Sequence, residues 1–216
     1  MTRICVLGTS HVGALMQADR TLPAQKGFDW EFFPIPNGYQ QGRGLHALTL
    51  NKEKTFLLGA PAGKKGAIRA IPLTGFDAFF LVGGLPTTMN FAPLLGPRVS
   101  ARFGPAAITD ICRNSRNHHV FAQIRQVSDA PVHVTMNYRP PNLAQEPAPP
   151  NLDEADDAVA EFWQGEYRAA LVRQPPALLD GDGFTPLECY LSQEDLHLTT
   201  DAAAMVLAQF REVMGG

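Results

Sequence analysis

A serine and a histidine at opposite ends of the chain have the surroundings that best fit a chemical role. Ser10 follows the apolar residues 4–7 in "RICVLGTSHVGALMQADRTL", and a helical pattern begins directly after it. His197 lies in "SQEDLHLTTDAAAMVLAQF", after Glu194 and Asp195 and before an amphipathic pattern. A serine becomes a nucleophile when a histidine takes its proton and a carboxylate orients that histidine. The two stretches therefore predict a Ser-His-acid triad for acyl transfer.

The other histidines fit this role less well than His197. In helical geometry His11 points about 100° away from Ser10. His118 and His119 are adjacent, so they cannot readily face one ion on a regular element, and no acids stand near them. His133 falls within an expected strand, where a core role is the simpler interpretation. The sequence therefore predicts no metal site.

The stretch around Ser10 is also open to two other interpretations. A dinucleotide-binding turn needs G-x-G-x-x-G, but Ser10 takes the middle position between Gly8 and Gly13 and would crowd a pyrophosphate. The acid expected about 20 residues further on would be Glu31, which falls inside an expected strand. The third interpretation is an ordinary connection in which Ser10 is only a turn residue or helix cap.

Short apolar runs alternate with helical patterns along the chain, which is typical of an α/β fold with a parallel sheet. We expect strands over residues 3–7, 30–35, 78–82 and 131–136, and helices after Ser10 and over about 105–114, 153–172 and 200–214. Ser10 would then stand at the carboxyl edge of the sheet, where such folds bind ligands. If the last helix packs beside the first, His197 returns to that edge, with its Nε2 about 3 Å from the Ser10 hydroxyl.

Two irregular segments interrupt this alternation within one expected domain, residues 1–216. Residues 37–73 are rich in glycine and include an expected hairpin, "LHALTLNKEKTFLLG". We predict an insertion that covers an edge or mouth of the sheet with few buried contacts and is mobile. Residues 137–151 contain five prolines and predict a stiff loop. Its first residues, Asn137, Tyr138 and Arg139, either contact a substrate or pack this loop.

Composition limits the classes of function. The formal net charge is -3, with 45% apolar and 18% charged residues, which gives no electrostatic reason to expect nucleic-acid or anionic-membrane binding. No apolar stretch is long enough to span a membrane. Three cysteines without a CxxC motif fit a reduced compartment, so we expect a cytoplasmic protein with no leader segment. The oligomeric state is not specified by the sequence.

The first and last motifs together resemble the SGNH (GDSL-type) hydrolase superfamily. "VLGTSH" is similar to the family's first block, with Thr9 in place of the acid of G-D-S, and the last block, D-x-x-H, is matched at His197. That register favours Glu194 as the orienting acid, with Asp195 as a close rival. The resemblance implies a flavodoxin-like three-layer α/β/α sandwich, hydrolysis of esters, and no metal or organic cofactor.

The resemblance also implies an oxyanion hole made by a glycine N–H after the second strand and an asparagine amide after the third. Gly38 is the candidate after the second strand. After the third comes Gly83-Gly84-Leu85-Pro86 without the asparagine, so Gly84, Asn90 and Asn137 are the candidates to bind the oxyanion or substrate. We predict an esterase for a small polar ester, such as an acylated or acetylated sugar. The alternative is a non-catalytic relative that binds a sugar or nucleotide in the same crevice.

Overall fold

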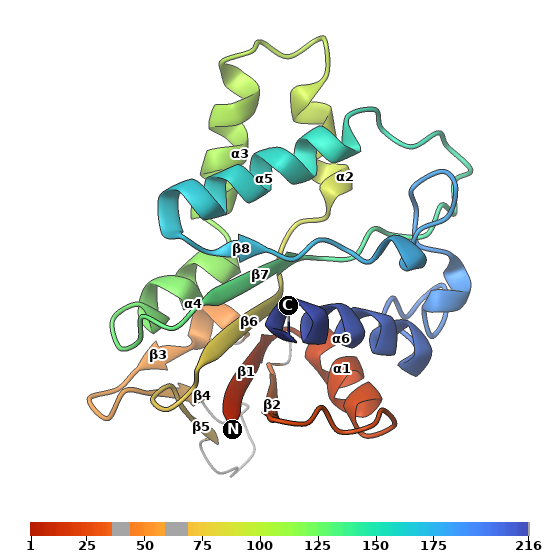
Figure 1. The fold of residues 1–216 in the computed structure, drawn as a ribbon. Coiled ribbons are helices and arrows are strands. Elements are labelled where there is room, and N and C mark those ends of the chain that lie inside the picture. Colours follow the sequence, from red (N-terminus) through yellow and green to blue (C-terminus); the bar gives the residue numbers. More distant parts are fainter. Residues whose placement is uncertain (36–43, 59–68, 216) are drawn as a thin grey trace, which may run out of the picture.

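A five-stranded parallel sheet forms the centre of the protein in the computed structural model, which describes residues 1–35, 44–58 and 69–215 (Figure 1). The strand order is β2-β1-β6-β7-β8. The strands are β1 (Thr2–Gly8), β2 (Phe28–Pro34), β6 (Ala78–Leu85), β7 (Val132–Met136) and β8 (Ala170–Leu171). All four pairs of neighbours are parallel, so the carboxyl ends of the strands share one edge of the sheet.

Helices cover both faces of this sheet and give the molecule three layers (Figure 1). On one face α1 (His11–Asp19) packs against α6 (Thr200–Gly215). The other face carries α3 (Phe103–Arg113), α4 (Arg116–Ile124) and α5 (Leu152–Tyr167). The short α2 (Thr88–Phe91) follows β6. The α/β/α sandwich expected from the sequence is therefore confirmed.

The alternation of side chains along β1 explains how one strand serves two cores. Ile4 and Val6 pack beneath α1 and α6, whereas Cys5 and Leu7 belong to the core under α3, α4 and α5. All four are completely buried, as expected for a strand of a parallel sheet with both faces covered. The apolar run before Ser10 therefore fixes β1 at the centre of the molecule.

The four strands expected from the sequence are all present, but two elements differ from expectation. The helix expected over 153–172 ends at Tyr167, because Arg168 adopts a left-handed conformation (φ 51°) and the chain continues as β8. Helix α4 was not predicted. Its sequence, RNHHVFAQI, is polar in its first turn, and Ser115 caps it by accepting the His118 N–H at 3.1 Å.

The described part of the insertion, residues 44–58 and 69–73, forms a second sheet of β3 (Thr49–Leu50), β4 (Thr55–Leu58) and β5 (Arg69–Pro72). The expected hairpin is confirmed as the antiparallel pair of β3 and β4. The prediction of few buried contacts is wrong for these residues. Five of their apolar side chains are at most 1% exposed and join the core under α3–α5: Leu45, Leu48, Phe56, Ile71 and Leu73.

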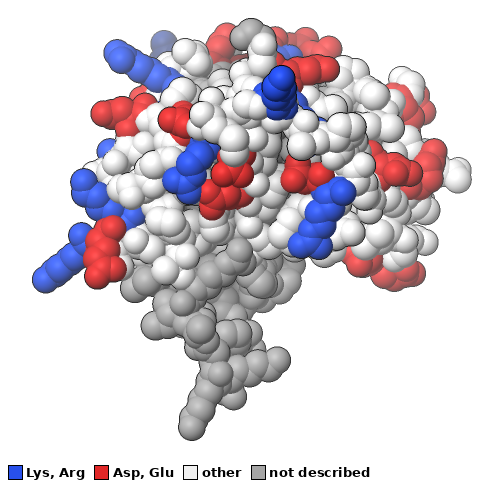
Figure 2. All heavy atoms as spheres, turned by 60° about the horizontal axis from the view of Figure 1, so that its bottom comes forward, with Lys and Arg blue, Asp and Glu red and all other residues white. Residues whose placement is uncertain are grey.

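None of the helices in the described ranges has the length and apolar character needed to cross a bilayer. Figure 2 shows acidic and basic side chains interspersed on the face that it presents, without a continuous patch of one sign.

Candidate active site

Ser10 stands where the sequence placed it, between the end of β1 and the start of α1 at the carboxyl edge of the sheet. The turn is held by β6, since the Thr9 N–H donates to the Val82 carbonyl at 3.0 Å. A side chain on Gly8 would come within 2.8 Å of the Val82 carbonyl carbon. The glycine before Thr9 therefore lets β1 lie against β6 at this turn.

Gly83, in β6, lies beside this turn. Its backbone has a φ of +72°, which favours glycine. A Cβ at this position would overlap the Thr9 hydroxyl and would lie 3.2 Å from both the Asn137 Oδ1 and the His11 Cδ2. The residue after β7 and the two residues that flank Ser10 therefore all lie close to this one glycine.

Asn117 is a residue of this region that the sequence did not reveal. It lies in the first turn of α4, is 0% exposed, and donates from its Nδ2 to the Thr135 carbonyl at 3.1 Å. Its Oδ1 has no partner among the described residues and points at Gly84, where a Cβ would overlap it. The pair Gly83-Gly84 was a signal that another group approaches this backbone closely, but the sequence does not say which one.

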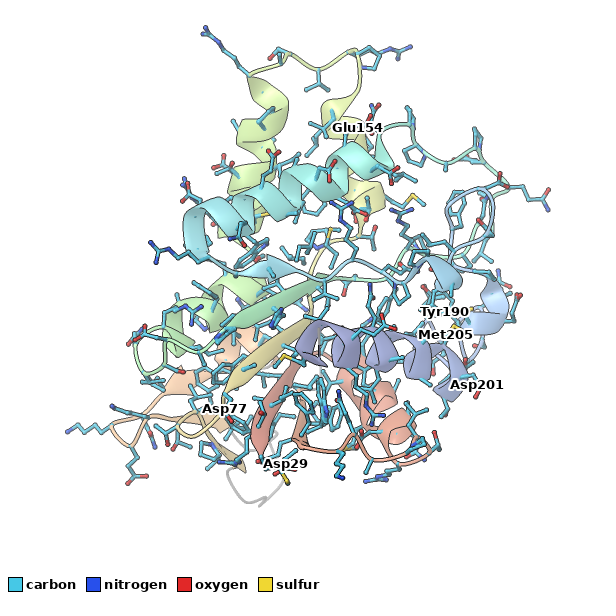
Figure 3. All side chains as sticks on the ribbon, in the orientation of Figure 1. Asp29, Asp77, Glu154, Tyr190, Asp201 and Met205 are labelled. Carbon is cyan, nitrogen blue, oxygen red and sulfur yellow. The ribbon has the colours of Figure 1, made fainter. Side chains whose placement is uncertain are left out.

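His197 lies on a short hairpin at the other side of the site. The Leu191 N–H donates to the His197 carbonyl at 2.9 Å, beside a bridge between Tyr190 and Leu198. Asp195 Oδ1 contacts the Nδ1 of His197 and also accepts its backbone N–H at 3.2 Å. These bonds hold the pKa of Asp195 below its usual value. Figure 3 shows the labelled Tyr190 near the beginning of α6.

Glu194, which the family register favoured, does not contact the imidazole of His197. Its Oε2 accepts the Ser192 hydroxyl at 3.1 Å within the same hairpin. The difference has a simple cause. With Ser192 accepting the N–H groups of both Glu194 and Asp195, the hairpin is so tight that the residue two before the histidine reaches its Nδ1. The rival, Asp195, is therefore the acid that contacts the Nδ1 of His197.

His197 lies next to the turn that carries Ser10, because its ring packs near the ring of His11. The rings of His197 and His11, which follows Ser10, have centroids 5.6 Å apart. Among the described residues no hydrogen bond joins Ser10 to His197, so their direct contact stays a prediction. Burial, and secondarily the nearby charge of His197, lowers the pKa of His11 to about 4. His11 is thus neutral at pH 7, with its ring edge-on to Tyr138 at 5.2 Å.

A cleft of about 470 Å³ is lined in part by Gly83. Gly83 and Asn137 belong to its wall, and a Cβ on Gly83 would meet Thr9 and His11, the residues on either side of Ser10. The described residues that line it are His46, Gly83, Gly84, Leu85, Pro86, Ile111, Asn114, Ser115, Arg116 and Asn137. In the described ranges no three His, Cys, Asp or Glu side chains gather as a metal site would require.

The remaining predicted site residues have different outcomes. Asn90 is exposed, and its Oδ1 accepts both the Thr87 N–H and the Thr87 hydroxyl at 3.1 Å, as in a helix cap. It therefore stabilises the start of α2 and is not assembled with the other candidates. Gly84 and Asn137 line the cleft beside Ser10. Gly38 lies outside the described residues.

Arg139, one of the residues left open between substrate contact and packing, is buried in the structure. It forms an ion pair with Asp156 at 3.1 Å, and its carbonyl accepts the Tyr190 hydroxyl at 2.6 Å. Both charged side chains are less than 10% exposed, and burial raises the pKa of Asp156 despite its hydrogen bond from Thr88. Packing of the proline-rich loop is thus the role that Arg139 fills here.

Comparison with known proteins identifies the fold. No family model and no curated protein matches the chain. Among solved structures, the lipase/acylhydrolase from Enterococcus faecalis shares 15% identity with a TM-score of 0.52, over 100% of this chain and 96% of that one. A protein assigned to the G-D-S-L lipolytic family, from Desulfitobacterium hafniense, shares 10% with a TM-score of 0.54, over 99% of each. A variant of the acetylxylan esterase from Geobacillus stearothermophilus shares 10% with a TM-score of 0.50, over 100% and 94%. The chain thus has the fold of the SGNH hydrolases.

Proposed function

We propose that this protein is an SGNH-type ester hydrolase with Ser10 as its nucleophile. The observation that carries the proposal is the Asp195–His197 pair, which lies against the residue directly after Ser10 although 187 positions separate serine and histidine in the chain. A carboxylate on Nδ1 leaves Nε2 of an imidazole free to accept a proton. The fold, shared with acylhydrolases and esterases, supports the same chemistry.

In the proposed reaction, His197 takes the proton of the Ser10 hydroxyl as the oxygen attacks the acyl carbon of the ester. The tetrahedral intermediate then expels the alcohol, which receives the proton from His197. Water, deprotonated by the same imidazole, hydrolyses the acyl-serine and regenerates the enzyme. Asp195 fixes the imidazole tautomer throughout and stabilises the imidazolium.

The oxyanion would be bound by backbone and amide donors at the start of α1. The Ser10 N–H stands at a helix N-terminus, where backbone donors face developing negative charge. The amide of Asn137 is the side chain best placed to replace the asparagine that is missing after β6, because it reaches Gly83 from the neighbouring strand. Gly84 and Gly38 remain candidates for a further N–H donor.

For the substrate, we propose a small polar ester, with an acyl or acetyl group on a sugar as the leading candidate. The cleft beside Ser10 contains amide, hydroxyl and guanidinium groups, which suit a hydroxylated ligand better than a long acyl chain. One structural neighbour is an acetylxylan esterase by name.

Active-site labelling distinguishes this enzyme from a non-catalytic module that binds a sugar or nucleotide. We expect a fluorophosphonate to modify the wild type once, at Ser10, and Ser10→Ala to abolish both labelling and hydrolysis of short p-nitrophenyl esters. The loss of a nucleophile lowers the rate by about 10⁴-fold or more. Ser100→Ala, which changes an exposed serine at the start of α3, is the matched control. Unlabelled wild type without hydrolysis would favour the binding module.

We also propose a cytoplasmic location, supported by the three cysteines. Cys5 and Cys112 are buried, Cys189 is half-buried, and all three are free thiols. Titration of the denatured protein, purified from its own cells under thiol-blocking conditions, should find three blocked thiols and no disulfide. A disulfide in that material would contradict the proposal.

A further inference from the structure

One buried ion pair connects the segments that leave the carboxyl ends of β6, β7 and β8. Arg139, three residues after β7, donates from its guanidinium to the Asp156 carboxylate of α5 at 3.1 Å, and both side chains are less than 10% exposed. The other carboxylate oxygen of Asp156 accepts the hydroxyl of Thr88, which follows β6, at 2.6 Å. A second guanidinium nitrogen of Arg139 donates to the Gly183 carbonyl, in the segment after β8, at 3.2 Å. The three segments therefore meet at this ion pair.

The backbone of Arg139 is held in place as well. Its N–H donates to the Gln174 Oε1 at 2.9 Å, and the Gln174 Nε2 donates to the hydroxyl of Thr185 at 2.7 Å. Thr185 is completely buried. The carbonyl of Arg139 accepts the Tyr190 hydroxyl at 2.6 Å. The acceptor of the Tyr190 hydroxyl therefore belongs to a residue whose side chain and backbone are both bonded to neighbouring segments.

Tyr190 connects Arg139 to the hairpin that carries His197. It is 5% exposed and pairs with Leu198 in the bridge at the base of the hairpin. Directly beyond this bridge, the Leu191 N–H donates to the His197 carbonyl at 2.9 Å. A continuous series of contacts thus runs from the ion pair through Arg139 and Tyr190 to the backbone of the proposed base.

Stability alone does not explain why this position carries charges. Two ions lose their hydration when they are buried, and apolar side chains of similar volume often give a fold that is equally or more stable. Burial raises the pKa of Asp156 even though Thr88 and Arg139 both bond to it. The Nε of Arg139 is also buried without a partner among the described residues. Charged hydrogen bonds fix the distances and directions between the groups that they join, so the ion pair suits a role in setting the geometry of the three segments.

We propose that Arg139 and Asp156 are positioning residues, which hold the hairpin at the distance from the Ser10 turn that ester hydrolysis requires. The inference rests on the proposed function, because it takes His197 as the base. The ring of His197 lies 5.6 Å from that of His11, the residue after Ser10. The base of the hairpin determines where that ring lies. A displacement of about 1 Å in a catalytic group can lower a rate by about 10²-fold.

A double variant separates positioning from stability. Arg139→Met with Asp156→Leu replaces the ion pair by apolar side chains of similar volume, an exchange that is often neutral or stabilising. We expect a urea midpoint close to that of the wild type. For a short p-nitrophenyl ester, kcat should fall about 10-fold or more while KM stays unchanged. A role in stability alone would leave kcat unchanged in a variant that is as stable as the wild type.

Two further variants complete the kinetic test. Arg139→Lys keeps the charge but lacks the planar fork that reaches both Asp156 and Gly183, so it should lose less kcat than the double variant. If the double variant does not fold, a wild-type kcat in Arg139→Lys would overturn the inference. Arg113→Gln with Glu166→Gln is the control, because it removes an exposed ion pair between α3 and α5, and it should retain the wild-type kcat and KM.

A nuclear Overhauser effect between the ring protons of His11 and His197 measures the position of the hairpin without a substrate. The wild type and the control should show it, because the two ring centroids are 5.6 Å apart. In the double variant it should weaken or disappear. An unchanged kcat, or a lower kcat with an unchanged Overhauser effect, would overturn the inference and leave ester hydrolysis standing.

The same measurement separates this failure from that of the proposed function. A wild type that hydrolyses no ester would refute the hydrolase. If the Overhauser effect is then lost in the double variant and kept in the control, the ion pair still positions the hairpin. If the effect persists in the double variant and no ester is hydrolysed, both proposals are refuted.

Discussion

The two sides of the candidate site are built in opposite ways. On the sheet side, Thr9 and Asn117 are at most 1% exposed, and Gly83 and Gly84 admit them so closely that a Cβ would collide. On the hairpin side, the side chains of Asp195 and His197 are 48% and 40% exposed and are held by short-range hydrogen bonds. The sheet side is held in position by the core of the protein, and the hairpin side by a few local hydrogen bonds.

This contrast indicates how the two sides would respond to change. Close-packed regions shift little, because any added volume displaces backbone. A hairpin with few buried contacts opens locally at small cost. The Ser10 turn and the cleft wall are therefore expected to be preformed, whereas the position of His197 relative to Ser10 adjusts when a substrate is bound.

The largest effect is expected on the hairpin side, in catalysis. Asp195→Asn should lower kcat for a short ester by about 10²-fold or more, because the amide no longer fixes the imidazole tautomer. Glu194→Gln is the matched control, since Glu194 contacts Ser192 and not His197, and it should retain the wild-type rate. Steady-state kinetics of the two variants decide the point. A larger loss in Glu194→Gln would return the role to the register favoured by the sequence.

The sheet side should show its largest effect in stability. Gly84→Ala places a methyl group against Asn117, 2.9 Å from its backbone nitrogen, so α4 must move. We expect a loss of about 3 kcal/mol in the free energy of unfolding, the upper part of the range for overpacking. Gly165→Ala on α5, where a Cβ meets nothing within 4 Å, is the control and should be neutral or stabilising. Urea denaturation measures both. Equal stabilities would contradict the close packing of α4.

His11, at the boundary of the two sides, should make stability depend on pH. Its pKa is about 4 in the folded protein, below the 6.5 of the unfolded chain. Between these values the unfolded state binds the additional proton, so stability decreases as pH falls. The expected loss from this group is about 2 kcal/mol between pH 7 and pH 5. In His11→Leu the free energy of unfolding should fall by about 2 kcal/mol less over the same pH range, because all other titratable groups are retained. Parallel slopes would show that His11 titrates normally.

The smallest effect is expected at the base of the hairpin. Tyr190→Phe removes the hydroxyl that donates to the Arg139 carbonyl and should cost about 1 kcal/mol of stability. Hydrogen exchange at residues 191–197 should become faster as well. Tyr138→Phe is the control, because that hydroxyl is buried without a partner among the described residues and its removal should cost nothing. Unchanged exchange in Tyr190→Phe would mean that the hairpin is held elsewhere.

An element could be predicted from the sequence where its local hydrophobic pattern is strong, and could not where that pattern is weak. Apolar runs such as residues 4–7 fix a buried strand by themselves, and the stripe containing Val206 and Phe210 fixes the last helix. Two short elements, α4 and β8, could not be predicted from the sequence. The polar first turn of α4 hides a buried Asn117, and β8 has only two residues after a left-handed Arg168.

The site residues were predictable by type but not by partner. A histidine with acids before it marks a candidate base, but whether Glu194 or Asp195 reaches the imidazole depends on the hairpin bonds of Ser192. The role of Asn90 depends on Thr87, because the Asn90 side chain accepts the Thr87 N–H at the start of α2. Such contacts are settled by local backbone geometry, which spacing in the sequence does not specify.

The second sheet has a consequence for anyone who would shorten or transplant this chain. Phe56, Ile71 and Leu73 are shared with the core that also contains Phe79 and Leu81 of β6. Excising residues 44–73 would therefore remove part of that core. The apolar side chains left uncovered in that core would favour self-association. Loop grafting at this position would therefore need to preserve the apolar side chains of β4 and β5.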